Sequence, residues 1–221
     1  MKQVLSIFLA LCLIAIGGFT FFEAQIMDAA DTYQEFTVSQ EVTGEISITD
    51  PATVTMDPAI AGLTGGVGTG TTTTIVTSTD TDGFNLYLSA SSTYSNASLE
   101  KDASYYFSDY DLGGTGGNAT TAPNFTWEVN AADSEFGYTV EGTDTASFFK
   151  DNGSICNLGS ANADYKCWQN ASTTNQVIGD RSSAATGGST ITIGFKAEVG
   201  STRNQESGNY QATVGLTAVV K

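Results

Sequence analysis

A repeated alternation of polar and apolar residues constrains the fold more than any other feature of this sequence. Between residues 35 and 49 every odd position is polar, whereas most even positions are apolar: Phe36, Val38, Val42, Ile46 and Ile48. Alternation with a period of two residues, in which one face is polar and exposed to solvent, is typical of a half-buried β-strand. Gln40 and Gly44 interrupt the apolar face, and we expect a bend or bulge at Gly44.

Four further segments alternate in the same way. Residues 71–91 predict a strand, an Asp82–Gly83 turn and a second strand with one apolar face, formed by Phe84, Leu86, Leu88 and Ala90. Residues 135–142, 189–200 and 209–220 each carry apolar side chains at every second position. Residues 62–74, "GLTGGVGTGTTTT", are of low complexity, and we expect a mobile loop there that leads into a strand. This pattern predicts an all-β sandwich or barrel that occupies residues 31–221.

The amino-terminal segment is hydrophobic. Residues 4–16 read "VLSIFLALCLIAI" after Lys2, and the apolar run continues to Phe22. We expect residues 1–30 to form one hydrophobic N-terminal helix, which is either a signal peptide or a retained membrane anchor. Residues 17–25, "GGFTFFEAQ", have the look of a type IV prepilin processing site. Because the apolar run precedes Gly18 and would be discarded, we expect no cleavage of that kind.

Charge and composition exclude several function classes. The 221 residues carry a net charge of −16, which argues against nucleic acid as a partner. The chain has no histidine, so catalytic triads and His-ligated zinc sites are excluded. Acid pairs such as Glu128 with Asp133, or Glu135 with Glu141, suit glycoside hydrolysis only across a cleft, which no sequence feature indicates. We therefore expect a protein that is not an enzyme.

Two cysteines bracket a short polar loop. Outside the cytosol, the spacing of Cys156 and Cys167 predicts a disulfide, which we expect to tether a surface loop without holding the core.

We expect no cofactor. Calcium stays an alternative, because "DTDG" at residues 80–83 and "DYDLGG" at residues 109–114 alternate oxygen ligands. We prefer a hairpin turn for the first of these, and the second is open.

Two sets of surface residues are candidates for interaction with sugars. Asn-x-Ser/Thr triplets, which are acceptors for glycosylation outside the cell, begin at Asn96, Asn118, Asn124, Asn152 and Asn170. Trp127, Trp168 and the aromatic residues 105–107 are either a sugar-stacking platform or, more commonly in a sandwich, part of the core.

Several strand segments resemble a known group of proteins. "ITIGFKAEVG" and "SGNYQATVGLTAVVK", together with "FGYTVEG" and "STDTDGFNLYLSAS", are similar to small secreted surface proteins of the fimbrial and spore-coat kind. In those families a Gly-x-Tyr-x-x-x-Val strand, here Gly208, Tyr210 and Val214, closes an immunoglobulin-like sandwich. The resemblance implies an immunoglobulin-like antiparallel β-sandwich located outside the cell or on its surface. It carries no catalytic residue.

These observations favour a secreted or cell-surface structural subunit that self-assembles into a pilus-like or coat-like filament. We expect residues 32–42, with Phe36, Val38 and Val42 on the apolar face, to complete the sheet of the next copy beside residues 209–220. The partners are then other copies of the chain, and the membrane through the N-terminal segment. An ordinary strand within its own domain is the alternative for this segment. A monomeric membrane-anchored adhesin or carbohydrate-binding module is the alternative function.

Overall fold

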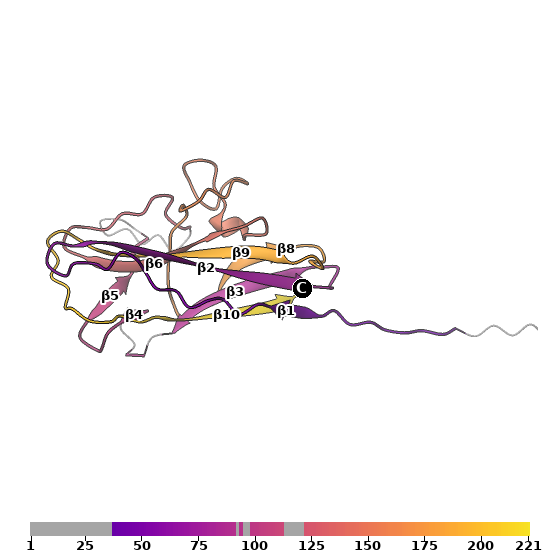
Figure 1. The fold of residues 1–221 in the computed structure, drawn as a ribbon. Helices are drawn as coiled ribbons and strands as arrows, with labels where there is room; N and C mark the ends of the chain where they lie inside the picture. Colours follow the sequence, from indigo (N-terminus) through magenta and orange to yellow (C-terminus); the bar gives the residue numbers. More distant parts are fainter. Residues whose placement is uncertain (1–36, 92, 95–97, 113–121) are drawn as a thin grey trace, which may run out of the picture. The chain divides into compact units, whose positions relative to one another are not determined.

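In the residues that the structure describes, nearly all regular structure is β-strand (Figure 1). The computed structural model describes residues 37–91, 93–94, 98–112 and 122–221. The chain divides into two units, residues 1–41 and residues 42–221. In the first unit the described residues are 37–41, which are exposed and have no regular secondary structure. The hydrophobic helix expected over residues 1–30 and the side chain of Phe36 lie outside the described residues. Within the described residues, no helix has the length and apolar character needed to cross a membrane.

The second unit contains two sheets. The larger sheet has the order β1 (Ile46–Ile48), β2 (Gly66–Ser78), β9 (Ser189–Val199), β6 (Ser134–Glu141), β5 (Tyr106–Asp109) and β4 (Leu99–Glu100), and β7 (Gln169–Asn170) also pairs with β6. The smaller sheet has the order β10 (Thr213–Val220), β3 (Phe84–Ser91) and β8 (Gln176–Arg181). All of these pairings are antiparallel except that of β5 with β6. A 3₁₀ turn, η1 (Ser147–Phe149), packs beside β6 and β8.

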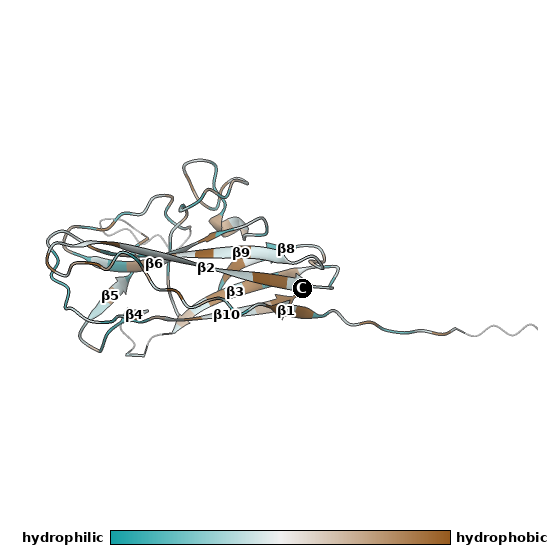
Figure 2. Cartoon of the chain, viewed as in Figure 1, coloured by the Kyte–Doolittle hydropathy of each residue, from teal (hydrophilic) through white to brown (hydrophobic). Residues whose placement is uncertain are grey.

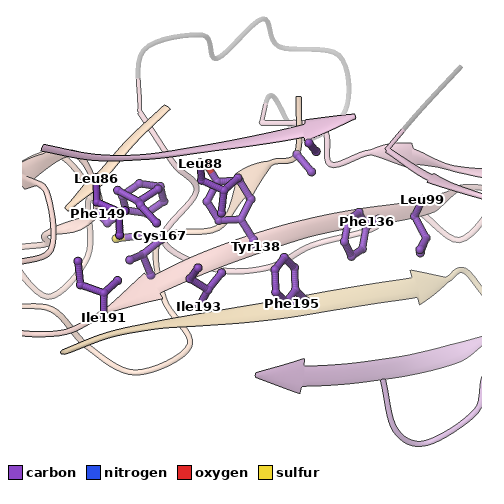
Figure 3. Packing of buried hydrophobic residues seen from close by; sticks show 14 of the residues in the cluster. Leu86, Leu88, Leu99, Phe136, Tyr138, Phe149, Cys167, Ile191, Ile193 and Phe195 are labelled. Carbon is purple, nitrogen blue, oxygen red and sulfur yellow. The ribbon is translucent and has the colours of Figure 1, made fainter. Parts of the chain in front are cut away.

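The two sheets share one hydrophobic core (Figure 3). The alternating faces predicted from the sequence point into it: β3 contributes Phe84, Leu86 and Leu88, which are at most 1% exposed. From the larger sheet, β6 and β9 contribute side chains that include Tyr138 and Ile193. Along these strands hydrophobic residues alternate with paler or hydrophilic ones (Figure 2). The prediction of an almost all-β fold is confirmed; β3 is buried on one face as expected, whereas β6 is buried on both faces.

Three local predictions were wrong. Of the glycine-rich residues 62–74, only 62–65 form a turn; β2 begins at Gly66 and pairs with β9 as far as Val76, so the expected loop is mostly strand. Residues 80–83 do form a turn, in which the Gly83 N–H donates to the Asp80 carbonyl and Gly83 has a φ of +88°. The turn does not close a hairpin, since β2 and β3 belong to different sheets.

The third difference concerns residues 35–49. Of the predicted strand, Ile46–Ile48 pair with β2, whereas residues 37–45 form no strand in the isolated chain. Gly44 therefore lies outside a strand and makes no bulge. Alternation alone predicts a strand that needs a neighbouring strand, and in the described part of the chain no strand pairs with residues 37–44.

Candidate functional site

A strap of irregular chain, residues 49–60, follows β1 along the outer edge of β2. It is hydrogen-bonded to β2 at its two ends: Thr49 N–H donates to the Ile75 carbonyl at 3.0 Å, and Asp57 and Thr69 exchange two bonds. Between these ends the hydroxyls of Thr72 and Thr74 donate to strap carbonyls. The strap therefore covers the edge of β2 without forming a continuous ladder.

Glycines in β2 allow the strap to lie this close. A Cβ at Gly70 would stand 2.4 Å from Cγ1 of Val54, and one at Gly68 would stand 3.0 Å from the Pro58 carbonyl oxygen. The side chains of Val54, Met56 and Ile60 then pack against the core. The low complexity of residues 62–74 thus has a packing role, which the sequence alone did not reveal.

A groove of about 860 Å³ separates the strap from residues 205–216, which lead into β10 and form its first half. Side chains from four strands of the larger sheet, β4, β5, β6 and β9, line its floor: Leu99, Phe107, Phe136, Ile193, Phe195, Ala197 and Val199. Tyr210, Ala212, Val214 and Leu216 form one wall, and they are only partly buried. Glu206 is the one charged residue among the lining residues. The core is therefore incompletely covered along this side of the molecule.

The backbone of β10 is unpaired along the groove. Odd-numbered residues bond toward β3, as the Lys221 N–H does to the Gly83 carbonyl, and Gln211 exchanges two bonds with Glu100. Successive peptide groups in a strand point to opposite edges, so the N–H and C=O groups of Ala212, Val214 and Leu216 point toward the groove. In the described residues no strand pairs with this edge. The groove thus combines an apolar wall with backbone groups that no described strand pairs.

Both ends of the groove are bounded. At one end the Gln205 N–H donates to the Gly62 carbonyl at 2.9 Å. At the other end β1 lies beside the C-terminal part of β10 (Figure 1). The groove is therefore a trough that opens sideways to solvent.

The predicted assembly segment is exposed where it is described. Val38 is 81% exposed and Val42 is 88% exposed, so both apolar side chains are accessible to solvent. Both are at even positions and would share one face of an extended strand. The third predicted residue, Phe36, lies outside the described residues. Val38 and Val42 thus form an exposed apolar face, and the groove has an apolar floor that is incompletely covered.

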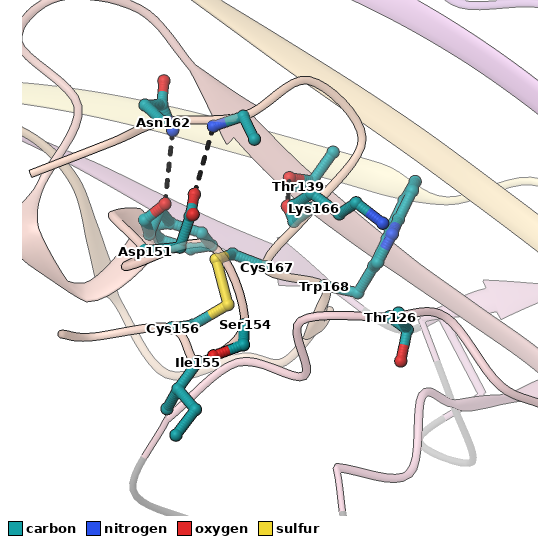
Figure 4. The surroundings of a disulfide bond; sticks show 12 residues. Thr126, Thr139, Asp151, Ser154, Ile155, Cys156, Asn162, Lys166, Cys167 and Trp168 are labelled. Atoms are coloured by element: carbon teal, nitrogen blue, oxygen red, sulfur yellow. Dashed lines mark hydrogen bonds between the residues drawn. A yellow bond between two sulfur atoms is a disulfide. The ribbon is translucent and has the colours of Figure 1, made fainter. Parts of the chain in front are cut away.

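The predicted disulfide is present (Figure 4). Cys156 and Cys167 are joined with Cα atoms 5.6 Å apart. Contrary to expectation, both side chains are buried, with exposed fractions of 2% and 1%, and they belong to the hydrophobic core. The loop returns over the core because Asp151 accepts the Ala163 N–H and Asn162 donates to the Phe149 carbonyl. Sequence spacing predicts the pairing but not this burial.

The aromatic candidates gather on the outer face of the larger sheet, but not as a platform. Tyr110 stacks on Trp127 with ring centres 4.1 Å apart, and the Lys196 ammonium lies 5.1 Å from the centre of the same ring. Trp168 is 3% exposed and meets the edge of Trp127. Of residues 105–107, Phe107 belongs to the core. Trp127 is thus partly buried and packed among Tyr110, Trp168 and Lys196.

Acidic residues surround a small polar pocket near Trp127. Its lining includes Asp111, Glu128, Glu135 and Glu198, and Glu198 accepts the Trp127 indole N–H at 2.7 Å. Burial raises the pKa of Glu135 to about 7, and the neighbouring carboxylates add to this effect. The partner proposed for it in glycoside hydrolysis, Glu141, lies six residues away on β6, about 20 Å along the strand, which is too far for that chemistry. In the described part of the chain, no three His, Cys, Asp or Glu residues come together to hold a metal.

The remaining predicted sites are scattered. Asn96 and Asn118 lie outside the described residues. Asn124 donates through its side chain to the Tyr110 hydroxyl, Asn170 accepts from Gln169, and Asn152 is exposed at a turn. Of the second calcium candidate, Asp109 accepts the Ser98 N–H, and residues 113–114 are not described. These residues do not converge on one site.

No protein-family model matches the chain, and no curated protein matches its sequence. The groove is thus the candidate site that the geometry itself supplies. The sequence indicated one wall of the groove, residues 209–220. It did not indicate the strap, because Pro51 and Pro58 argue against a strand there.

Proposed function

We propose that the protein is an exported structural subunit that assembles with copies of itself by β-strand addition. The observation that carries this proposal is the groove, in which an apolar floor lies beside the unpaired edge of β10. Backbone groups of an added strand would bond to this edge, and its alternate side chains would enter the groove. The occupant is a segment of a second copy, residues 32–43, of which the structure describes residues 37–43.

The chemistry of this segment supports the choice of occupant. In residues 37–43 the even positions are Val38, Gln40 and Val42, and the one charge, Glu41, is at an odd position. With the even positions inward, Glu41 faces solvent and the groove receives no charge. Seven residues span about 23 Å as a strand, the same length as the wall from Tyr210 to Leu216.

Fold and location complete the proposal. The two sheets with a shared core support an immunoglobulin-like sandwich that lacks one strand. The buried disulfide supports an oxidising location, outside the cell or on its surface. The apolar sequence of residues 4–16 supports passage into or through a membrane as a signal peptide or anchor. The subunit works by assembly and carries out no catalysis.

Electron microscopy of the purified full chain tests this function directly. We expect fibres from the native protein and single particles after deletion of residues 32–41. A synthetic peptide of residues 32–43 should bind the deleted protein and raise its melting temperature. A native protein that stays monomeric, or a deleted protein that still polymerises, would overturn the proposal; the first result would leave a surface adhesin as the better hypothesis.

A further inference from the structure

Resting on the proposed function, we infer that the added strand runs antiparallel to β10, and that this direction is what makes the assembly an open polymer. The inference depends on where two features lie in the fold. One is the end of the sheet at which the chain before β1 arrives. The other is the direction of β10 along the groove.

The chain before β1 arrives at the same end of the domain as the C-terminus. Glu45 accepts the Thr79 N–H, just beyond the end of β2. The Lys221 N–H donates to the Gly83 carbonyl in the turn that follows β2. We call this end, defined by Glu45, the turn at residues 79–83 and Lys221, the arrival end. β10 therefore runs toward the arrival end.

The opposite end of the groove is defined by the Gly62–Gln205 hydrogen bond, and we call it the far end. From the far end, Tyr210, Ala212, Val214 and Leu216 follow one another along the groove wall. A strand antiparallel to β10 would have its first residue toward the arrival end and its last residue at the far end.

The link between the inserted segment and its own domain is short. If Val42 occupies the groove of one copy, residues 43–45 alone connect it to Glu45 in its own sheet, and three residues reach about 10 Å. The arrival end of the donating copy must therefore lie against the end of the groove where its residue 43 leaves. Strand direction consequently decides which ends of two copies meet.

With an antiparallel strand, residue 43 leaves at the far end of the accepting copy. The arrival end of one copy then meets the far end of the next, and each copy keeps one free groove or one free segment for a further copy. With a parallel strand, two arrival ends would meet, and each copy could donate to the other, which closes a symmetric dimer. An open polymer with this short link thus requires the antiparallel direction.

The fold favours the same direction. The smaller sheet is antiparallel throughout, and an antiparallel strand on β10 continues its bonding pattern. At the arrival end β1 packs beside β10, so the link of a parallel strand would have to cross over it. In the antiparallel arrangement the odd-numbered residues of both strands face solvent. Thr43 of the donating copy then lies near Gln211 of the accepting copy, and Thr37 lies near Thr217.

Mixed cysteine variants of the full chain test the direction. Thr37→Cys and Thr43→Cys serve as donors, and Gln211→Cys and Thr217→Cys serve as acceptors; all four residues are exposed. Each molecule carries one new thiol, so a bond between a donor and an acceptor cysteine joins two different molecules. Opposed residues that do not exchange hydrogen bonds have Cα atoms about 4.5 Å apart, which suits a disulfide. Equal mixtures are oxidised mildly, and the linked peptides are identified by mass spectrometry, which also separates products that involve Cys12.

For the antiparallel strand we expect fibres in which residue 43 is disulfide-linked to residue 211, and residue 37 to residue 217. Links between residues 37 and 211, and between residues 43 and 217, should not form. The reverse pair of products, accompanied by closed dimers in sedimentation, would overturn the direction while strand addition stands. Fibres that yield none of the four products would overturn donation by this segment, and with it the proposed function.

Discussion

Glu135 is the single residue at which the structure and simple electrostatics give the clearest expectation. Burial raises the pKa of its carboxyl from 4.5 to about 7, so the folded state holds the proton more tightly than the unfolded chain. The stabilising contribution is complete below pH 4.5 and is lost as the pH rises through about 7. At pH 8 the ionised carboxylate of Glu135 therefore lowers the free energy of unfolding.

The Glu135→Gln variant should remove this pH dependence. Its amide oxygen can still accept the Asp111 N–H, but it carries no charge. Between pH 5 and pH 8 we expect the free energy of unfolding to fall less than in the native protein, by on the order of 2 kcal/mol. Denaturant unfolding at both pH values measures this difference. Glu141→Gln, on the same face of β6, is the control, and equal pH dependence in the Glu135 variant and the native protein would contradict the expectation.

Val38 and Ser39 provide a matched pair for the assembly segment. Both are exposed in the isolated chain, so Val38→Asp and Ser39→Asp should leave the melting temperature of the monomer unchanged. In the proposed polymer only the even position, Val38, faces the groove. Loss of one buried valine costs about 2 kcal/mol, or roughly a thirtyfold weaker association. Pelleting assays at several concentrations compare the variants, and equal pelleting of the two would show that Val38 is not buried by assembly.

Among the elements, β2 and the strap depend on each other through glycine. Gly70→Ala brings a Cβ to within 2.4 Å of Val54 and should push the strap from the edge of β2. We expect a loss of about 1 to 3 kcal/mol in the free energy of unfolding, as for other overpacked sites. Gly215→Ala, on β10, meets its nearest atom at 3.8 Å and should be tolerated. Thermal unfolding compares the two variants, and similar melting temperatures would exclude a packing role for Gly70.

The elements also show what the sequence could predict. The core-facing side chains of strands β3, β6 and β9 were predicted correctly. Alternation of apolar residues over this length is typical of a β-strand and of no helix. β4 and β7 have two residues each and carry no periodicity that a pattern could detect. β8 was missed because its apolar pair, Val177 and Ile178, are adjacent in the sequence and do not alternate.

The candidate groove was beyond prediction for a different reason. Its two walls, the strap and residues 205–216, are separated by most of the chain, and only the folded sheets bring them to one side of the core. The exposed alternating residues 37–43 were visible in the sequence, but a strand without a neighbour looks the same as a strand with one. The sequence could therefore suggest the proposed donor segment, but it could not suggest the proposed acceptor groove.

At the scale of the whole molecule, charge opposes assembly. Each copy carries a net charge of −16, whereas residues 37–43 and the groove lining contribute one carboxylate each, Glu41 and Glu206. Added salt should therefore screen the repulsion between copies and leave the apolar contact intact. Screening lengths fall from about 10 Å at 0.1 M salt to about 3 Å at 1 M. We expect light scattering to show faster assembly as salt rises over this range, and fibres that dissolve in high salt would indicate an ionic contact instead.

The buried disulfide makes a covalent ring of the chain between Cys156 and Cys167. Leu158 and Tyr165, both about half exposed, lie within this ring. A protease that cuts the backbone beside either residue opens the ring without separating the pieces. In a fibre of the proposed kind, a subunit cut in this way would gain one water molecule and stay in place, and a gel would separate its two pieces only after a thiol reagent had reduced the disulfide.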